Sequence, residues 1–135
     1  MAKVFTTDTG STLTTSLVSY FKLENVADVY STNLLTNFNT STFITGKVNN
    51  AAKFNGTTQY LQRANVLSAA TNNFSMFMWV YVPTTSEKGC FAHNGLDTAV
   101  IPDGFAIGVG DTTFDGVGNN LLILLSGVAW LDTGL

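Results

Sequence analysis

The chain has 135 residues, a length typical of one domain, and carries a net charge of −3 with a pI near 4.7. Hydrophobic residues make up 45% and charged residues 11%, so the composition indicates a folded chain rather than a disordered one. The six Lys and Arg residues are scattered, which argues against a nucleic-acid-binding surface. Twenty Thr and 13 Asn residues favour strands and turns over helices. The predicted class is therefore all-β.

Cysteine and histidine each occur once, as Cys90 and His93. Neither an intrachain disulfide nor a Cys/His zinc site can be assembled from them. A buried Cys and a loop His explain the pair better than catalysis does. No apolar run reaches the length of about 18 residues that a membrane span needs, and the N-terminus shows no apolar signal-peptide core. We therefore expect no membrane span and no secretory signal.

Residues 1–15 are Thr-rich and lack a sustained periodicity, which predicts an extended arm. Such an arm either anchors the chain to a neighbour or is a mobile terminus. Residues 17–24, LVSYFKLE, alternate between two faces and predict the first core strand. The polar, turn-rich stretch 25–50 predicts one or two short strands.

Residues 51–65, AAKFNGTTQYLQRAN, predict a hairpin. Phe54 is expected to enter the core, Asn55-Gly56 supplies the left-handed geometry of a tight turn, and Tyr60 and Leu61 return on the partner strand.

Residues 74–82, FSMFMWVYV, form the strongest strand pattern of the chain and end at Pro83, which has no amide hydrogen. Their even-numbered positions predict a core face, and the odd-numbered ones carry Phe77, Trp79 and Tyr81. That aromatic row either packs under a covering loop, the favoured interpretation, or stacks on sugar rings. Under the second interpretation the candidate glycan-binding residues are Phe77, Trp79, Tyr81, His93 and Asn94.

One further strand and one apolar run are predicted near the C-terminus. In residues 105–109, FAIGV, the bulky side chains share one face, while the opposite face carries small residues and suits close approach by another backbone. Residues 121–131, LLILLSGVAWL, are the most apolar run and must be buried.

Three stretches in this order, LVSYFKLE, GKVNNAAKFNGTTQYL and FSMFMWVYV, carry a family resemblance. They resemble the laminin G-like domains of the concanavalin A-like lectin and glucanase superfamily. The matching positions of the second stretch are Gly46, Lys47, Asn50, Ala51, Phe54, Gly56, Tyr60 and Leu61. The resemblance covers roughly residues 16–82 well and the remainder loosely.

The resemblance implies an antiparallel β-sandwich of the jelly-roll type over residues 16–135. One departure is Asn49, where the family often has Gly. Another is the absence of the Trp-His-His segment and Asn-Gly hairpin that follow in the family, so the sandwich is expected to lack its last strands. Open edges of that kind are usually paired or covered. We therefore expect either a fragment of a longer protein or a chain completed by a partner.

Catalysis and metal binding are less well supported by the sequence. Glucanases of the superfamily place paired carboxylates on one strand, whereas Glu24 and Glu87 lie in unrelated segments, so no enzyme is expected and no catalytic residue is assigned. Laminin G-like domains often hold calcium at the sandwich rim, which makes Asp111, Asp115 and Asn119 the candidate ligands. Ordinary turn chemistry explains these three residues better. No other cofactor is expected.

Two functions remain open. The first is a non-enzymatic structural or surface-attachment module, a decoration or fibre component of a virion (phage), that assembles as a homo-oligomer or with another structural chain. The alternative is a glycan-binding lectin domain of a larger cell-surface or extracellular protein. Both place the protein on a virion or an extracellular surface.

Overall fold

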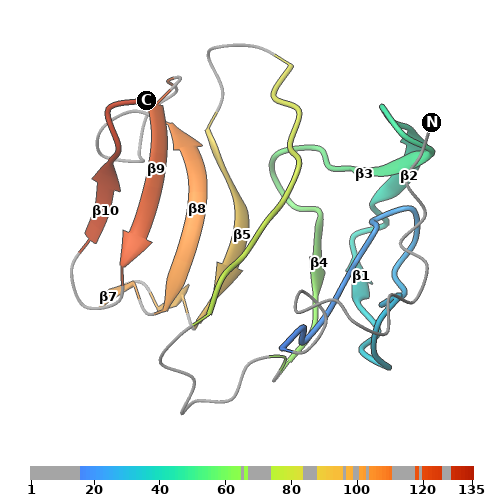
Figure 1. Cartoon of the computed structure of the whole chain (residues 1–135). Coiled ribbons are helices and arrows are strands. Elements are labelled where there is room, and N and C mark those ends of the chain that lie inside the picture. Colours follow the sequence, from blue (N-terminus) through green and yellow to red (C-terminus); the bar gives the residue numbers. More distant parts are fainter. Residues whose placement is uncertain are drawn as a thin grey trace. The chain divides into compact units, whose positions relative to one another are not determined.

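A computed structural model describes residues 16–64, 66, 74–83, 88–95, 97–98, 101–102, 104–110, 118, 120–125 and 129–135. Within these ranges the chain forms ten strands and no helix (Figure 1). The strands pair antiparallel throughout, which confirms the predicted all-β class. The predicted arm, residues 1–15, lies outside the described residues.

The structure divides into two compact units, Met1–Thr71 and Asn72–Leu135. The single domain predicted over residues 16–135 stays a prediction.

The first unit contains two small sheets. Strand β1 (Thr36–Phe38) pairs with β4 (Tyr60–Gln62), and β2 (Thr42–Thr45) pairs with β3 (Asn50–Lys53). Residues 25–50 thus contain β1 and β2, which agrees with the one or two short strands predicted there. In the first sheet Phe38 lies directly opposite Tyr60, and their rings stack at a centroid separation of 4.6 Å. Cross-strand aromatic pairs of this kind stabilise a sheet.

The first core strand predicted over residues 17–24 does not form, and that prediction is wrong. Side-chain exposure alternates from residue 17 to 22 as expected, but the pairing is a single bridge between Phe21 and Asp28. Leu23 adopts a left-handed backbone with φ 59°, which an extended strand cannot accommodate. The extended stretch therefore ends before a ladder can develop.

The predicted hairpin is also wrong, although a turn forms where it was expected. Gly56 has φ +72°, the left-handed geometry predicted for it. The flanking strands β3 and β4 nevertheless pair with β2 and β1 rather than with each other. Phe54 is 42% exposed and does not enter a core.

The hairpin of this unit lies earlier, between β2 and β3. Its loop is closed by a hydrogen bond from Gly46 N–H to the Asn49 carbonyl at 2.7 Å. Asn49 has φ 55°, and asparagine tolerates this left-handed conformation better than most residues. Asn49, where laminin G-like domains often have Gly, therefore has a backbone conformation that suits Gly.

The second unit contains a four-stranded antiparallel sheet in the order β10-β9-β8-β5. Its strands are β5 (Gly89–Asn94), β8 (Phe105–Gly110), β9 (Asn120–Leu125) and β10 (Ala129–Asp132). A separate two-residue pair, β6 (Asp97–Thr98) and β7 (Ile101–Pro102), lies between β5 and β8 in the chain. The strand predicted over residues 105–109 is confirmed as β8.

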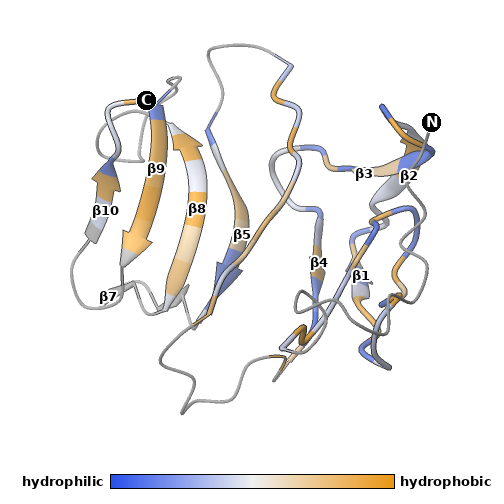
Figure 2. Ribbon diagram, viewed as in Figure 1, coloured by the Kyte–Doolittle hydropathy of each residue, from blue (hydrophilic) through white to orange (hydrophobic). Residues whose placement is uncertain are grey.

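The hydrophobic core of the described residues lies on β8 and β9. Its buried apolar side chains are Ala106, Val109, Leu122 and Leu124. Leu122 is completely buried, as predicted for the apolar run 121–131, whereas Leu131 of the same run is 41% exposed and contradicts that prediction. Figure 2 shows β9 apolar along most of its length. The small-residue face of β8 is also buried, which agrees with the expected close approach at that face.

Candidate functional site

Residues 74–83 are the most unusual described segment of the second unit. They form no strand and pair with none of the ten strands (Figure 1). The predicted central core strand is therefore wrong. High β-propensity favours an extended backbone, but a ladder also needs a neighbouring strand with a free edge in register. The segment meets the first condition but does not pair with β5, the edge strand of the four-stranded sheet.

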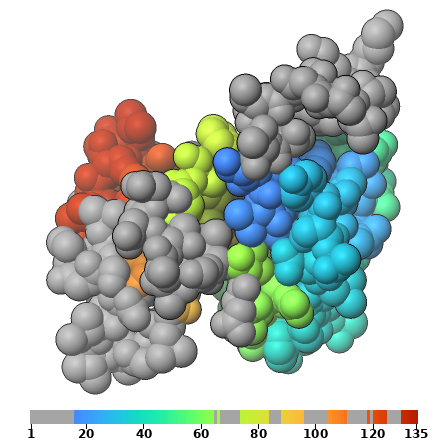
Figure 3. All heavy atoms as spheres, turned by 60° about the horizontal axis from the view of Figure 1, so that its bottom comes forward, coloured from blue at the N-terminus to red at the C-terminus, as the bar shows by residue number. Residues whose placement is uncertain are grey.

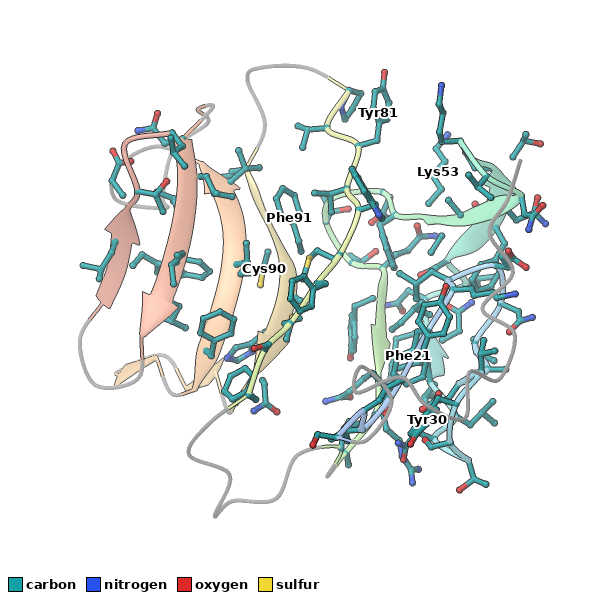
Figure 4. All side chains as sticks on the ribbon, in the orientation of Figure 1. Phe21, Tyr30, Lys53, Tyr81, Cys90 and Phe91 are labelled. Atoms are coloured by element: carbon teal, nitrogen blue, oxygen red, sulfur yellow. The ribbon has the colours of Figure 1, made fainter. Side chains whose placement is uncertain are left out.

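The aromatic row of this segment is exposed. Phe77, Trp79 and Tyr81 are 94%, 102% and 89% exposed, so the favoured interpretation, burial under a covering loop, is wrong. On the predicted core face Met76, Met78 and Val82 are only partly exposed, but Phe74 and Val80 are 39% and 53% exposed, so the core-face prediction is wrong at these two positions. Figure 3 shows atoms of this segment at the surface in yellow-green, and Figure 4 shows Tyr81 projecting away from the ribbon.

The start of the segment is attached to the four-stranded sheet. The Phe74 ring meets the Phe105 ring edge to face, with centroids 5.3 Å apart. Phe105 lies directly opposite Asn94 in the β5–β8 ladder. Phe74 precedes the first residue of the aromatic row, Phe77, by three positions. Of the predicted glycan-binding residues, Asn94 is the cross-strand neighbour of Phe105, the residue that Phe74 contacts.

His93 and Cys90 lie on β5 rather than where the sequence placed them. His93 was expected in a loop and is an exposed strand residue opposite Ala106. Cys90 was expected to be buried and is exposed. The ladder shifts register between Cys90 and Ala92, which makes Phe91 the extra residue of a bulge. The Cys90 thiol donates to the Ala92 carbonyl across this bulge, at 3.3 Å.

Exposed apolar side chains are also common in the first unit. They are Val18, Tyr20, Val29, Tyr30, Leu34, Ile44, Val48, Phe54 and Tyr60. The only buried residue described in this unit is Ser41. Its hydroxyl oxygen has no hydrogen-bond partner. A single exposed apolar residue is ordinary on a protein surface. In the described part of this unit, however, the exposed apolar residues far outnumber the buried residues, and this imbalance needs an explanation.

A carboxylate hub, which the sequence reasoning did not identify, organises the start of the first unit. The Oδ1 atom of Asp28 accepts hydrogen bonds from the backbone N–H groups of Tyr20, Tyr30 and Ser31 at 3.0, 2.8 and 3.0 Å. Its Oδ2 atom accepts from the Ser31 hydroxyl at 2.5 Å and from Asn33 Nδ2 at 3.4 Å. The signal for this hub is Asp28-Val-Tyr-Ser31, since Asp accepts readily from amides two and three residues later.

The hub perturbs the acidity of Asp28. Desolvation raises the pKa of this carboxyl, but the hydrogen bonds from the Ser31 hydroxyl and three backbone amides outweigh it. The pKa of Asp28 therefore lies well below its ordinary value. Because its oxygens are occupied by local donors, the hub acts as a structural cross-link and does not present a free carboxylate.

Side-chain amides fix the loop between β1 and β2. Asn37 accepts from the Ser41 N–H at 2.8 Å and donates to the Ser41 carbonyl at 2.9 Å. Gln59 donates to the carbonyls of Asn39 and Thr40 at 3.1 and 3.0 Å. Asn39 and Thr40 both have left-handed backbones, with φ 57° and 60°, which is costly for a β-branched residue. The amide hydrogen bonds hold the loop in this conformation.

The predicted calcium ligands Asp111, Asp115 and Asn119 lie outside the described residues, as does Glu87. Among the residues that the structure does describe, no cluster of three or more His, Cys, Asp or Glu side chains could hold a metal ion. Nor do those residues include a helix suited to crossing a bilayer.

The surface that stands out is thus uncharged and apolar. The aromatic row can stack on a flat ligand, and the adjoining backbone can pair with another strand. No protein-family model, no curated protein and no solved structure matches the chain.

Proposed function

We propose that this chain is a non-enzymatic structural or surface-attachment module, serving as a decoration or fibre component of a virion. In this proposal it has a laminin G-like β-sandwich of the concanavalin A-like jelly-roll type and belongs to a virion or extracellular surface. The observation that carries the proposal is the extent of exposed apolar side chains in the described part of the chain, where only four apolar residues are buried. Large exposed apolar patches mark interaction surfaces.

The size of the sheets supports the same conclusion. The first unit has two two-stranded sheets, and such pairs are marginally stable in water without a packed face. Its described residues supply no buried apolar side chain that would pack such a face. Contact with another subunit would cover these faces and would add apolar burial at about 25 cal/mol per Å².

The proposal is tested by the solution mass of the chain, measured by light scattering after size-exclusion chromatography. We expect a discrete oligomer that dissociates on dilution. Replacing Val48, which is 63% exposed, by Ser should weaken an oligomer that uses the first unit, because Val48 lies in the β2–β3 loop at its surface. The matched control is Thr57→Ser, an exposed turn position without apolar bulk. A stable, well-folded monomer at all concentrations would contradict the proposal.

A glycan-binding lectin domain is the second candidate, favoured by the full exposure of Phe77, Trp79 and Tyr81. Apolar faces of sugar rings stack on such side chains. A glycan array should then show specific binding that Trp79→Ala abolishes. Tyr30→Ala, which removes an exposed aromatic residue of the first unit, should leave binding unchanged. Binding that survives Trp79→Ala would contradict this candidate.

A further inference from the structure

The backbone of residues 74–82 has the properties of a strand without a partner. The segment is rich in aromatic and β-branched residues, alternates in exposure and pairs with none of the ten strands. An extended backbone with open N–H and C=O groups is a template for pairing with another strand. The question is which chain supplies that strand.

The charge of the region is compatible with a second copy of the same segment as the partner. From Ala64 to Ser86 the sequence contains no charged residue. A partner that recognises charge would find nothing to pair with here, whereas a second copy of the same segment meets no like-charge repulsion. Neutrality on both sides therefore favours a homotypic contact.

We propose that residues 74–82 pair with the same residues of a second copy of this chain, as antiparallel strands related by a two-fold axis at Met78. This inference rests on the proposed assembly function and names the partner and the register. Full overlap of the nine residues places the axis at the central residue. Such an interface is isologous, so the same residues contact each other from both sides.

The register that follows places each aromatic side chain opposite another aromatic residue or opposite a serine. In antiparallel pairing about Met78, Phe77 lies opposite Trp79 of the second copy, and Trp79 lies opposite its Phe77. Ser75 lies opposite Tyr81 on the same face. Both aromatic pairs are therefore cross-strand neighbours, an arrangement that contributes about 0.2–1 kcal/mol per pair beyond small residues. A slip by one residue would place these aromatics opposite residues of the other face.

The exposed aromatic area is comparable with the area of a small stable interface. A covered aromatic side chain buries about 150–250 Å². The three aromatic residues of two copies therefore offer about 900–1,500 Å², before any backbone area is added. Stable interfaces begin at about 1,200 Å² in total. The near-complete exposure of Phe77, Trp79 and Tyr81 leaves this area available in the single chain.

The competing partner for the segment is within the same chain. Strand β5 is an edge of the four-stranded sheet, and Phe74 already contacts Phe105 on the neighbouring strand β8. Pairing of residues 74–82 with β5 would be independent of protein concentration, whereas pairing with a second copy depends on it. The test must therefore distinguish the two pairings by their dependence on protein concentration and by the register of the two strands.

The test is disulfide trapping in a Cys90→Ser background. Met78→Cys places the two thiols directly opposite each other, with Cβ atoms about 4.5–5.5 Å apart, which a disulfide can bridge. The matched control is Val80→Cys, whose opposite residue is Met76, so its two thiols lie about 13 Å apart along the strands. We expect Met78→Cys to form a covalent dimer at least tenfold faster than Val80→Cys under mild oxidation.

Hydrogen exchange of the unmodified chain gives an independent readout. About every second amide of residues 75–82, the set that faces the second copy, should become protected as the concentration rises through the dimerisation range. Two outcomes would overturn the inference and leave the proposed function standing: equal cross-linking of both variants, or an oligomer that traps neither. Protection of these amides at every concentration would show pairing inside the chain and would also overturn it. A chain that stays monomeric, with the amides of residues 75–82 unprotected at every concentration, would contradict both the strand pairing and the proposed function.

Discussion

Replacing Asp28 by Asn tests whether the carboxylate hub holds the first unit together. The asparagine keeps one side-chain oxygen that can accept the hydrogen bonds from the three backbone N–H groups that now donate to Asp28 Oδ1. It loses the negative charge. Its side-chain NH₂ group would replace Asp28 Oδ2, which now accepts a hydrogen bond from Asn33 Nδ2. Two donors would then face each other. Hydrogen bonds to charged groups contribute about 1.5–3 kcal/mol when buried, and partial exposure reduces this. We expect a loss of about 1 kcal/mol in the local opening free energy.

The assay is hydrogen exchange at amides that the hub supports. Val29 N–H donates to the Tyr20 carbonyl at 2.8 Å, and Leu35 N–H donates to the Val26 carbonyl at 2.9 Å. A loss of 1 kcal/mol lowers their protection about fivefold. The control is Glu24→Gln, because Glu24 accepts one exposed hydrogen bond from Asn49, which a glutamine oxygen can keep. Equal protection in Asp28→Asn and Glu24→Gln would refute the reasoning.

The same variant has a defined pH dependence. The pKa of Asp28 is lowered in the folded state, so its stabilisation is complete above the unfolded value of about 3.9 and is lost as the pH falls toward the folded value. The difference between wild type and Asp28→Asn should therefore be constant from neutral pH to about pH 5 and should shrink below about pH 4. A difference that grows under acid would contradict this sign.

Three further changes give distinct results. Leu122→Ala should lower the free energy of unfolding, measured by urea denaturation, by about 2–5 kcal/mol, because the Leu122 side chain is completely buried. The control Leu131→Ala should lower it by about 1 kcal/mol or less, because Leu131 is partly exposed. Ser41→Ala should be neutral or stabilising by up to about 1 kcal/mol in the same assay, since it removes a buried hydroxyl without a partner; a loss above 1 kcal/mol would contradict it. Asn49→Ala should cost about 1 kcal/mol because alanine is strained at φ 55°, whereas Asn49→Gly should cost less than half of that; equal losses would show that the side chain matters more than the backbone.

The sequence predicted the local properties of this chain better than its pairings. Alternation correctly placed β8, and apolarity correctly placed Leu122 in the core. These properties depend on a residue and its immediate neighbours. The predicted hairpin failed because Asn55-Gly56 specifies a turn and not which strands flank it in a sheet.

The candidate site shows the same limit. The sequence identified Phe77, Trp79 and Tyr81 as an aromatic row, but residue types alone could not decide between burial and exposure, and the favoured interpretation was wrong. The Asp28 hub escaped notice because Tyr20 contacts it from eight residues away. Pairing partners at such distances are set by the folded chain and are not encoded in a local pattern.

The uncharged segment 74–82 also affects the fate of newly made chains. Nine consecutive β-forming residues without charge, glycine or proline match the composition of segments that stack into cross-β filaments. Pro83 follows directly and acts as a gatekeeper at one end only. Correct association and filament growth therefore compete for the same backbone groups. The rate of synthesis relative to association would then decide the yield of soluble protein.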